Sequence, residues 1–288
     1  MLIQKVNTLC DILHITQDKL NTILANTDGY YHEFKRLKYT NQNTPRVDKN
    51  GNPAYRILCN VSEPLKKLQT QINNYLVKNV QVANYDFGGI KKHDNILNAK
   101  MHQGNKYAFQ TDMKNFYPHI TNKIVYDMFV RVGFSCDVAS VLTKLTTNKG
   151  HLPQGAPTST TIANLVFVPT GNKILEITKI RHLTFTTFID DITISGKKDF
   201  KELVPTFLNI IRNGGFKISI NKTSYKSNPK DITGVKTLNN GLSTTEKFNR
   251  KFSGNLPPKV KKGMENYKNR IKKISSTPLH LIKQQIGN

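Results

Sequence analysis

Two adjacent carboxylates, Asp190 and Asp191, are the clearest chemical signal in the chain. They lie in a run of β-branched, aromatic and polar residues from 184 to 196, which predicts two strands joined by a tight turn. Neighbouring carboxylates repel each other unless a cation lies between them. From these residues alone two interpretations stay open: an ordinary Asp-containing hairpin turn, or a platform for metal ions.

A third carboxylate, Asp112, ends a short strand predicted to begin at Lys106. Three aspartates from one strand end and one hairpin turn can hold two hard divalent cations through their oxygens. Two such ions about 3.5–4 Å apart stabilise the attacking and leaving oxygens of a phosphoryl transfer. Residues 152–159 read Leu-Pro-Gln-Gly-Ala-Pro-Thr-Ser, which predicts a rigid loop that approaches a nucleotide and whose hydroxyls cap the next helix.

Taken in order, these motifs resemble the palm of a reverse transcriptase: Asp112, Pro153-Gln154-Gly155-Ala156-Pro157 and Phe188-Ile189-Asp190-Asp191. Two more segments are similar to signatures of the bacterial retron branch, Asn98-Ala99-Lys100-Met101-His102 and Ile232-Thr233-Gly234-Val235. The resemblance covers about residues 30–260. It implies an α+β right-hand polymerase with fingers, an antiparallel palm sheet and a short thumb.

The resemblance also implies an activity. The protein would be an RNA-directed DNA polymerase in anti-phage defence, which copies a structured non-coding RNA with dNTPs and forms an RNA–DNA hybrid. An effector or toxin protein would accompany it. Asp112, Asp190 and Asp191 would hold two Mg²⁺ ions, and Lys222 would act near the leaving pyrophosphate as a general acid or electrostatic stabiliser, with an exposed turn lysine as the alternative.

Other residues take roles by the same resemblance. The incoming nucleotide would be bound by Arg56, Lys38, Tyr117, Gln154 and Gly155. The alternatives are solvated hairpin charges for Lys38 and Arg56, and a core aromatic for Tyr117. Asn98 and His102 would contact nucleic acid, and the loop 84–98, with its Gly, aromatic and Lys residues, fits such a contact too. Phe188 replaces the tyrosine that is usual in retron enzymes, which removes one hydroxyl but leaves the carboxylates intact.

Composition agrees with a polyanionic partner. The 43 Lys and Arg residues against 19 Asp and Glu give a formal net charge of +24, which attracts phosphates. A membrane-surface or ribosomal protein is the alternative on charge alone. The sequence contains neither a run of 18 apolar residues nor a signal-peptide pattern, so we expect a cytoplasmic protein without membrane contact. Three scattered cysteines predict buried, reduced thiols.

We expect four regions: N-terminal helices over 1–29, fingers over 30–100, palm over 101–235 and a short basic thumb over 236–288. Thr16 is a predicted N-cap, and residues 49–52 are a predicted hairpin turn. The helix after this hairpin has a predicted apolar stripe that includes Val77, and Phe216–Ile220 is a predicted edge strand. The thumb has an apolar stripe that predicts an amphipathic helix: Val260, Met264, Tyr267, Ile271 and Ile274. Its opposite side would grip duplex phosphates, or be merely solvated, through Lys261, Lys262, Lys268, Arg270, Lys272 and Lys273.

Two other functions remain open. One is a different bacterial defence or abortive-infection reverse transcriptase, with untemplated or protein-primed DNA synthesis. The other is a non-enzymatic RNA-binding protein on a polymerase scaffold, which the three intact carboxylates disfavour.

Overall fold

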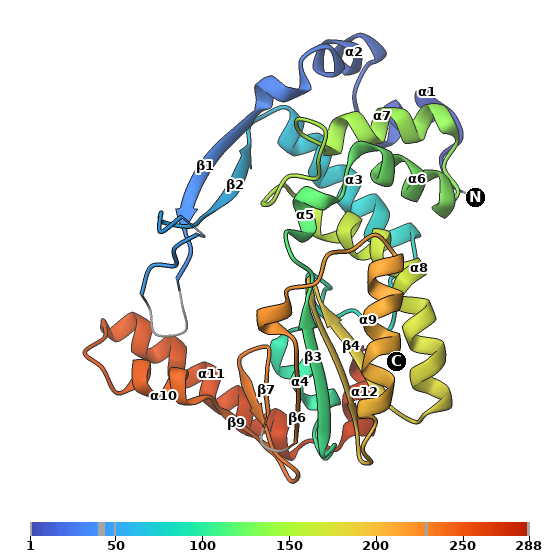
Figure 1. Ribbon diagram of the computed structural model, residues 1–288. Helices are drawn as coiled ribbons and strands as arrows, with labels where there is room; N and C mark the ends of the chain where they lie inside the picture. The colour runs from blue at the N-terminus through green and yellow to red at the C-terminus, as the bar shows by residue number, and fades with distance from the viewer. Residues whose placement is uncertain (1, 40–43, 49, 228–229, 287–288) are drawn as a thin grey trace. The chain divides into compact units, whose positions relative to one another are not determined.

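The computed structural model describes residues 2–39, 44–48, 50–227 and 230–286. The chain forms two compact units, each discontinuous in sequence: Met1–Val82 with Asn115–Val166, and Ala83–Lys114 with Phe167–Asn288 (Figure 1). The units therefore cut across the four regions expected from the sequence, since residues 83–100 group with the palm strands and 115–166 with the N-terminal helices.

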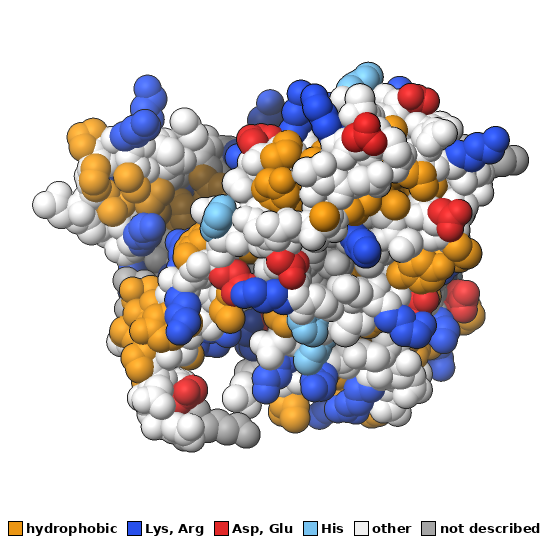
Figure 2. All heavy atoms as spheres, turned by 90° about the horizontal axis from the view of Figure 1, so that it is seen from above, with side chains coloured by type: hydrophobic (Ala, Val, Ile, Leu, Met, Phe, Trp, Pro, Cys, Tyr) orange, Lys and Arg blue, Asp and Glu red, His pale blue; other side chains and the backbone are white. Residues whose placement is uncertain are grey.

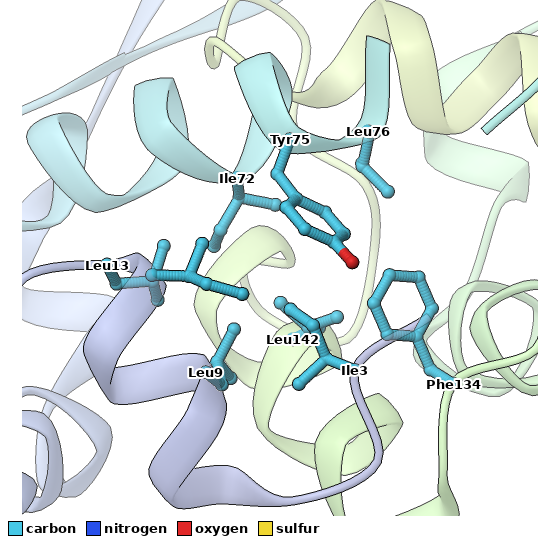
Figure 3. Close-up of a pocket in the computed structure, with 9 residues that line it drawn as sticks. Ile3, Leu9, Leu13, Ile72, Tyr75, Leu76, Phe134 and Leu142 are labelled. Carbon is cyan, nitrogen blue, oxygen red and sulfur yellow. The ribbon is translucent and has the colours of Figure 1, made fainter. Parts of the chain in front are cut away.

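The first unit is mostly helical. It contains α1 (Val6–Ile12), α2 (Gln17–Ala25), the 3₁₀ turn η1 (Thr27–Tyr30), α3 (Leu65–Asn79), α5 (Phe116–His119), α6 (Asn122–Val132), α7 (Cys136–Thr146) and the start of α8 (Ser159–Ile180). Thr16 caps α2 as predicted, because its hydroxyl accepts a hydrogen bond from the Lys19 amide at 3.4 Å. Apolar side chains from α1, α3 and α7 surround a small cavity (Figure 3). Val77, predicted in the apolar stripe of α3, is instead 46% exposed. Cys10 and Cys59 are buried as predicted, but Cys136, at the start of α7, is exposed.

A two-stranded ribbon also belongs to the first unit. β1 (Tyr31–Leu37) pairs with β2 (Tyr55–Val61) in antiparallel register, which confirms the predicted fingers hairpin. Arg36 lies directly opposite Arg56, and Lys38 follows two residues later on the same face, because strand side chains alternate. The predicted turn over 49–52 includes Lys49, which lies outside the described residues.

The second unit is built on a four-stranded sheet in the order β4-β5-β3-β6. Its strands are β4 (Thr184–Phe188), β5 (Asp191–Gly196), β3 (Tyr107–Asp112) and β6 (Ser224–Ser227). Phe109 on β3 stacks against Phe207 of α9 (Val204–Asn213), which follows the 3₁₀ turn η2 (Lys201–Leu203) and covers one face of the sheet. The other face therefore carries the alternate, mostly polar residues of each strand.

The strand predicted over Phe216–Ile220 is wrong. Only an isolated bridge joins Ile218 to Met113, the 3₁₀ turn η3 (Ile220–Lys222) follows, and the edge strand is β6 instead. The reason is that this segment folds back over the end of β3, where the Ser219 amide donates to the Asp112 carbonyl at 2.8 Å.

The remainder of the second unit joins a small sheet to helices. The sheet contains β7 (Lys230–Ile232), β8 (Val235–Thr237) and β9 (Leu242–Thr244), and the helices are α4 (Asn95–Met101), α10 (Glu246–Phe252), α11 (Pro258–Ser276) and α12 (Leu279–Ile286). Ile96, Val235 and Ile271 share a buried cluster that holds α4, β8 and α11 together. The predicted apolar stripe of α11 is confirmed at Ile271 but not at Val260, which is 42% exposed. Among the described residues, no helix is long and apolar enough to cross a membrane.

Candidate active site

The three aspartates lie at one end of the four-stranded sheet. Asp112, the last residue of β3, is paired directly opposite Asp191, the first residue of β5. Asp190 lies in the turn between β4 and β5, and its carbonyl accepts a hydrogen bond from the Met113 amide at 2.9 Å. Like charges directly opposite each other destabilise a sheet. This end of the sheet is therefore a place where positive charge is favoured.

Two side chains donate hydrogen bonds to the Asp112 carboxylate and so offset its negative charge. The Ser219 hydroxyl donates to Oδ1 of Asp112 at 2.5 Å, and the Lys222 ammonium is bonded to Oδ2. Asp112 is buried, whereas the Lys222 side chain is 48% exposed. Lys222 thus lies beside the carboxylate of Asp112, and its role at the leaving pyrophosphate stays a prediction. Ser219 was not predicted, because nothing in the sequence indicates that the segment after α9 folds back onto Asp112.

The electrostatics of Asp191 reflect the same crowding. Surrounding protein withdraws water from it, and the charges of Asp190 and Asp112 repel its own, so its pKa is raised to about 6 although the side chain keeps access to solvent. Lys222 opposes this shift. A lysine ammonium standing against a carboxylate is a natural stand-in for a metal cation, so the donor set fits hard divalent ions.

The carboxylate side chains do not converge on a single metal position. Within the part of the chain that the structure describes, no three His, Cys, Asp or Glu side chains converge tightly enough to coordinate a single ion. Each oxygen of Asp112 already accepts one hydrogen bond, from Ser219 or from Lys222.

The residues predicted to bind the nucleotide belong to the first unit. The loop 152–158 is attached to β2, because the Cys59 amide donates to the Gln154 carbonyl at 2.8 Å. Gly155 has φ +115°, and a Cβ there would lie 2.8 Å from the Cys59 carbonyl oxygen, so only glycine fits. β2 also carries Arg56, so one strand connects two of the predicted contacts. Lys38 shares the ribbon face of Arg56.

Tyr117 lies in α5 and is buried. Its hydroxyl is 3.2 Å from the Thr160 hydroxyl in the first turn of α8. The predicted hydroxyl cap of α8 is wrong: among the described atoms, Thr158 Oγ1 and Ser159 Oγ are buried without a hydrogen-bond partner.

Asn98 and His102, predicted to contact nucleic acid, are instead buried inside the second unit. Each is at most 1% exposed. Asn98 donates to the Thr233 hydroxyl at 3.2 Å. The two ring nitrogens of His102 lie 2.6 Å from the Ser195 hydroxyl and 2.7 Å from that of Thr186. Burial, with a smaller effect of the Lys230 charge, lowers the pKa of His102 to about 3, so the ring is neutral.

The two signature segments therefore contact each other. Asn95, at the start of α4, donates to the Thr233 carbonyl at 2.9 Å and to the Tyr267 hydroxyl of α11 at 2.7 Å. Arg270 of α11 pairs with Asp94 at 2.5 Å, so it is engaged within the protein. These bonds fix α11 on α4.

The remaining basic residues of α11 lie mostly in solvent. Lys261, Lys262 and Lys272 are exposed, and the Lys268 ammonium lies 5.5 Å from the centre of the Phe252 ring. Many Lys and Arg side chains also lie on the face drawn in Figure 2, with fewer acidic ones among them, as the net charge of +24 leads one to expect.

The antiparallel sheet carries one carboxylate at the end of β3, one opposite it at the start of β5, and a third in the turn between β4 and β5. This arrangement defines the palm of a right-hand polymerase. The sequence profile described as "Reverse transcriptase (RNA-dependent DNA polymerase)" matches residues 47–238. The chain belongs to this family.

Its relatives identify the branch. It is 28% identical over 261 residues to the Retron Se72 reverse transcriptase of Salmonella heidelberg, covering 87% of this chain and 66% of that protein. It is 29% identical over 237 residues to the Retron Ec86 reverse transcriptase of Escherichia coli, covering 80% and 71%. With the Retron Ec48 reverse transcriptase of Escherichia coli it shares 26% identity, covering 69% of this chain and 52% of the relative. The retron-type resemblance is confirmed.

The match is partial in length, since the chain spans about half to 71% of these three relatives. Among solved structures, a telomerase from Candida tropicalis aligns with a TM-score of 0.49 and 12% identity, covering 79% of this chain and 59% of that one. This likeness adds nothing to the family assignment.

Proposed function

We propose that the protein is a retron-type RNA-directed DNA polymerase that extends a primer hydroxyl with dNTPs on a structured RNA template. One observation carries the proposal: Asp112 lies directly opposite Asp191, with Asp190 in the adjoining turn, in a chain of the reverse transcriptase family. Three carboxylates in this arrangement suit the oxygen-ligand chemistry of nucleotidyl transfer.

In this proposal Asp112, Asp190 and Asp191 would hold two Mg²⁺ ions. Bound there, the ions would lower the pKa of the primer hydroxyl and neutralise charge on the triphosphate. The chain's own contribution is to keep the carboxylates in place and to position the primer end and the nucleotide in line, which are the main sources of catalysis in phosphoryl transfer.

Lys222 would change its partner during the reaction. In the structure its ammonium is bonded to Asp112, and its half-exposed side chain is free to reach a ligand. It would leave the carboxylate when a cation binds and then donate to, or stabilise, the leaving pyrophosphate.

The first unit would supply nucleotide contacts. Arg56 and Lys38, on one face of the ribbon, would bind triphosphate oxygens. The backbone at Gln154 and Gly155 would approach the nucleotide, and Tyr117 would exclude a 2′-hydroxyl by its bulk.

Partners follow from the same proposal. The relatives are named as retron reverse transcriptases, so we propose a structured non-coding RNA and the RNA–DNA hybrid as ligands. The exposed lysines of α11 would hold their phosphates. We also propose that the protein acts in anti-phage defence together with an effector protein.

A primer-extension assay tests the function and separates it from both alternatives. Purified protein receives dNTPs, Mg²⁺ and a structured RNA with an annealed primer, and parallel reactions omit the template or contain EDTA. The proposal predicts template-complementary products that require Mg²⁺. Products without template would indicate untemplated synthesis. RNA binding without products in any arm would indicate a non-enzymatic scaffold.

A further inference from the structure

Residues 85–88 lie beside the turn that carries Asp190, although the proposed reaction assigns them no role. Residues 85–88, the start of the loop expected to contact nucleic acid, are buried instead. They lie along the free edge of β4 as a short parallel addition. The Phe87 amide donates to the Thr187 carbonyl and the Thr187 amide donates to the Tyr85 carbonyl, each at 2.8 Å.

A side-chain bond strengthens this edge. The Thr187 hydroxyl donates to Oδ1 of Asp86 at 2.5 Å, and Asp86 is only 1% exposed. Thr187 lies in β4, three residues before Asp190. The segment is therefore attached to the strand that leads directly into the turn. A buried hydrogen-bonded pair of this kind has few alternative arrangements, because breaking it leaves a polar atom unsatisfied.

Gly88 is in contact with the turn itself. A Cβ at this position would lie 2.5 Å from both the amide nitrogen and Cγ1 of Ile189, and 2.9 Å from the carbonyl carbon of Phe188. Its φ lies outside the left-handed region that requires glycine. Glycine is needed here for space alone.

Ile189 supplies the second observation. Its φ is +62°, in the left-handed region, which a β-branched residue adopts only when its surroundings enforce it. Two contacts hold this part of the turn: Gly88 lies against Ile189, and the Met113 amide is bonded to the Asp190 carbonyl. Phe188 also packs against the cluster that contains Phe87 and Ile282. The turn is thus contacted by residues 85–88 and by Met113, the residue that follows β3.

We propose that residues 85–88 form an edge clamp that positions Asp190 and Asp191, with Gly88 acting as a positioning residue through Ile189. The clamp keeps the turn in a strained conformation from which the two carboxylates project toward Asp112. This inference rests on the proposed function, because it assigns the clamp's purpose to the reaction of those carboxylates.

The test compares two glycines of the second unit. Gly88→Ala places a methyl group against the turn. Gly196→Ala is the matched control, since its Cβ would lie 2.5 Å from Cδ2 of Leu183, at the end of β5 remote from Asp191 and without contact to residues 85–88. For each variant we would measure the melting temperature, kcat and KM for single-nucleotide addition, and affinity for Mn²⁺ by electron paramagnetic resonance.

We expect Gly88→Ala to lower kcat by about 10²-fold, as a displacement of about 1 Å does at a reacting centre. Its Mn²⁺ affinity should fall, while RNA affinity and KM for dNTP stay near wild type. Gly196→Ala should lower the melting temperature, because its methyl group crowds Leu183, with kcat within a few-fold of wild type. The clamp is wrong if Gly88→Ala keeps wild-type kcat and Mn²⁺ affinity, or if both variants lose kcat equally at equal melting temperature.

A second variant covers the case in which Gly88→Ala does not fold. Ile189→Gly removes the backbone strain, so its melting temperature should equal or exceed that of wild type. We expect faster amide hydrogen exchange at residues 189–191 and a lower kcat. Unchanged exchange and unchanged kcat would overturn the clamp. If wild-type protein does not polymerise at all, the proposed function fails, whereas Mn²⁺ affinity and hydrogen exchange still decide the clamp.

Discussion

One face of the palm sheet is neutral toward its middle and negatively charged at one end. Toward its middle, Thr186 and Ser195 are buried and bonded to His102, and the cluster is neutral. At its end, Asp191 continues the same alternation along β5 and meets Asp112, and there negative charge is incompletely balanced. Polar residues on a strand face are therefore part of the core where every atom has a partner. Such residues form a candidate functional site where their negative charges outnumber the positively charged and hydrogen-bond-donating groups around them.

The largest expected effect concerns the charged end. Asp190→Asn should reduce nucleotide addition by at least about 10³-fold, because it removes a charged ligand oxygen from the cation site. It should not lower the melting temperature in EDTA, since removing one charge relieves repulsion with its neighbours. Primer extension and thermal unfolding of the same preparation check both statements. Near wild-type extension in Mg²⁺ would remove Asp190 from the site.

The neutral middle should respond in the opposite way. His102→Leu should cost about 2–4 kcal/mol of unfolding free energy, because it leaves two buried hydroxyls short of a partner. Nucleotide addition by the folded fraction should stay within a few-fold of wild type. Denaturant unfolding and active-site-normalised kinetics measure the two quantities, and a loss of activity without a loss of stability would contradict the comparison.

The pH dependence of that variant sharpens the same point. Folding keeps His102 neutral down to a pKa of about 3, whereas an unfolded histidine binds a proton below about pH 6.5. Protonation of the unfolded chain therefore destabilises wild-type protein as the pH falls from about 6.5 toward 3. The stability advantage of wild type over His102→Leu should shrink across this range. A constant difference would mean that His102 is protonated in the folded protein.

The lysines of α11 also differ in how far their charges contact the rest of the protein. Lys272 is exposed, while Lys268 lies over the Phe252 ring. Reversing both to Glu should weaken RNA binding and reduce the slope of log affinity against log salt by roughly one unit per lost phosphate contact. Single-nucleotide addition at saturating RNA should change much less. Lys123→Glu on α6, which loses only a surface pair with Asp127, serves as the control; an unaltered slope would place the duplex elsewhere.

The smallest effect is one of selectivity. Tyr117→Val should raise the use of rNTPs relative to dNTPs by about tenfold or more, because the proposed discrimination is steric. Tyr117→Phe retains the ring and loses only the hydroxyl that lies beside Thr160, so it should keep wild-type selectivity. Steady-state incorporation of matched rNTP and dNTP measures the ratio. Equal selectivity in all three proteins would remove Tyr117 from the nucleotide site.

Local patterns in the sequence predicted most of the palm. Alternation over 184–196 gave the hairpin that ends in Asp190 and Asp191, and the spacing of Thr16 gave the cap of α2. The motif order led to the family that the profile match confirmed. These features depend on neighbours within a few residues, which a sequence displays directly.

What failed depended on distant contacts. His102 and Asn98 carry the polar chemistry of a nucleic-acid contact, but their partners, Ser195 in β5 and Thr233 in the turn between β7 and β8, lie far along the chain. Likewise Ser219 and Gly88 gain their roles only when remote segments close on the catalytic end of the sheet. Periodicity cannot reveal whether a polar residue finds such a partner.

The most direct test of the central claim, that the crowded carboxylates form a cation site for nucleotide addition, uses Asp112→Asn. Asp112 is the member of the trio already held by Ser219 and Lys222. The measurement is single-turnover addition of one dNTP to an RNA-templated primer across a Mg²⁺ titration, with thermal unfolding alongside. We predict that wild type adds the nucleotide and is stabilised by Mg²⁺, and that the folded variant does neither. Wild-type addition by Asp112→Asn, at the same Mg²⁺ midpoint, would contradict the account.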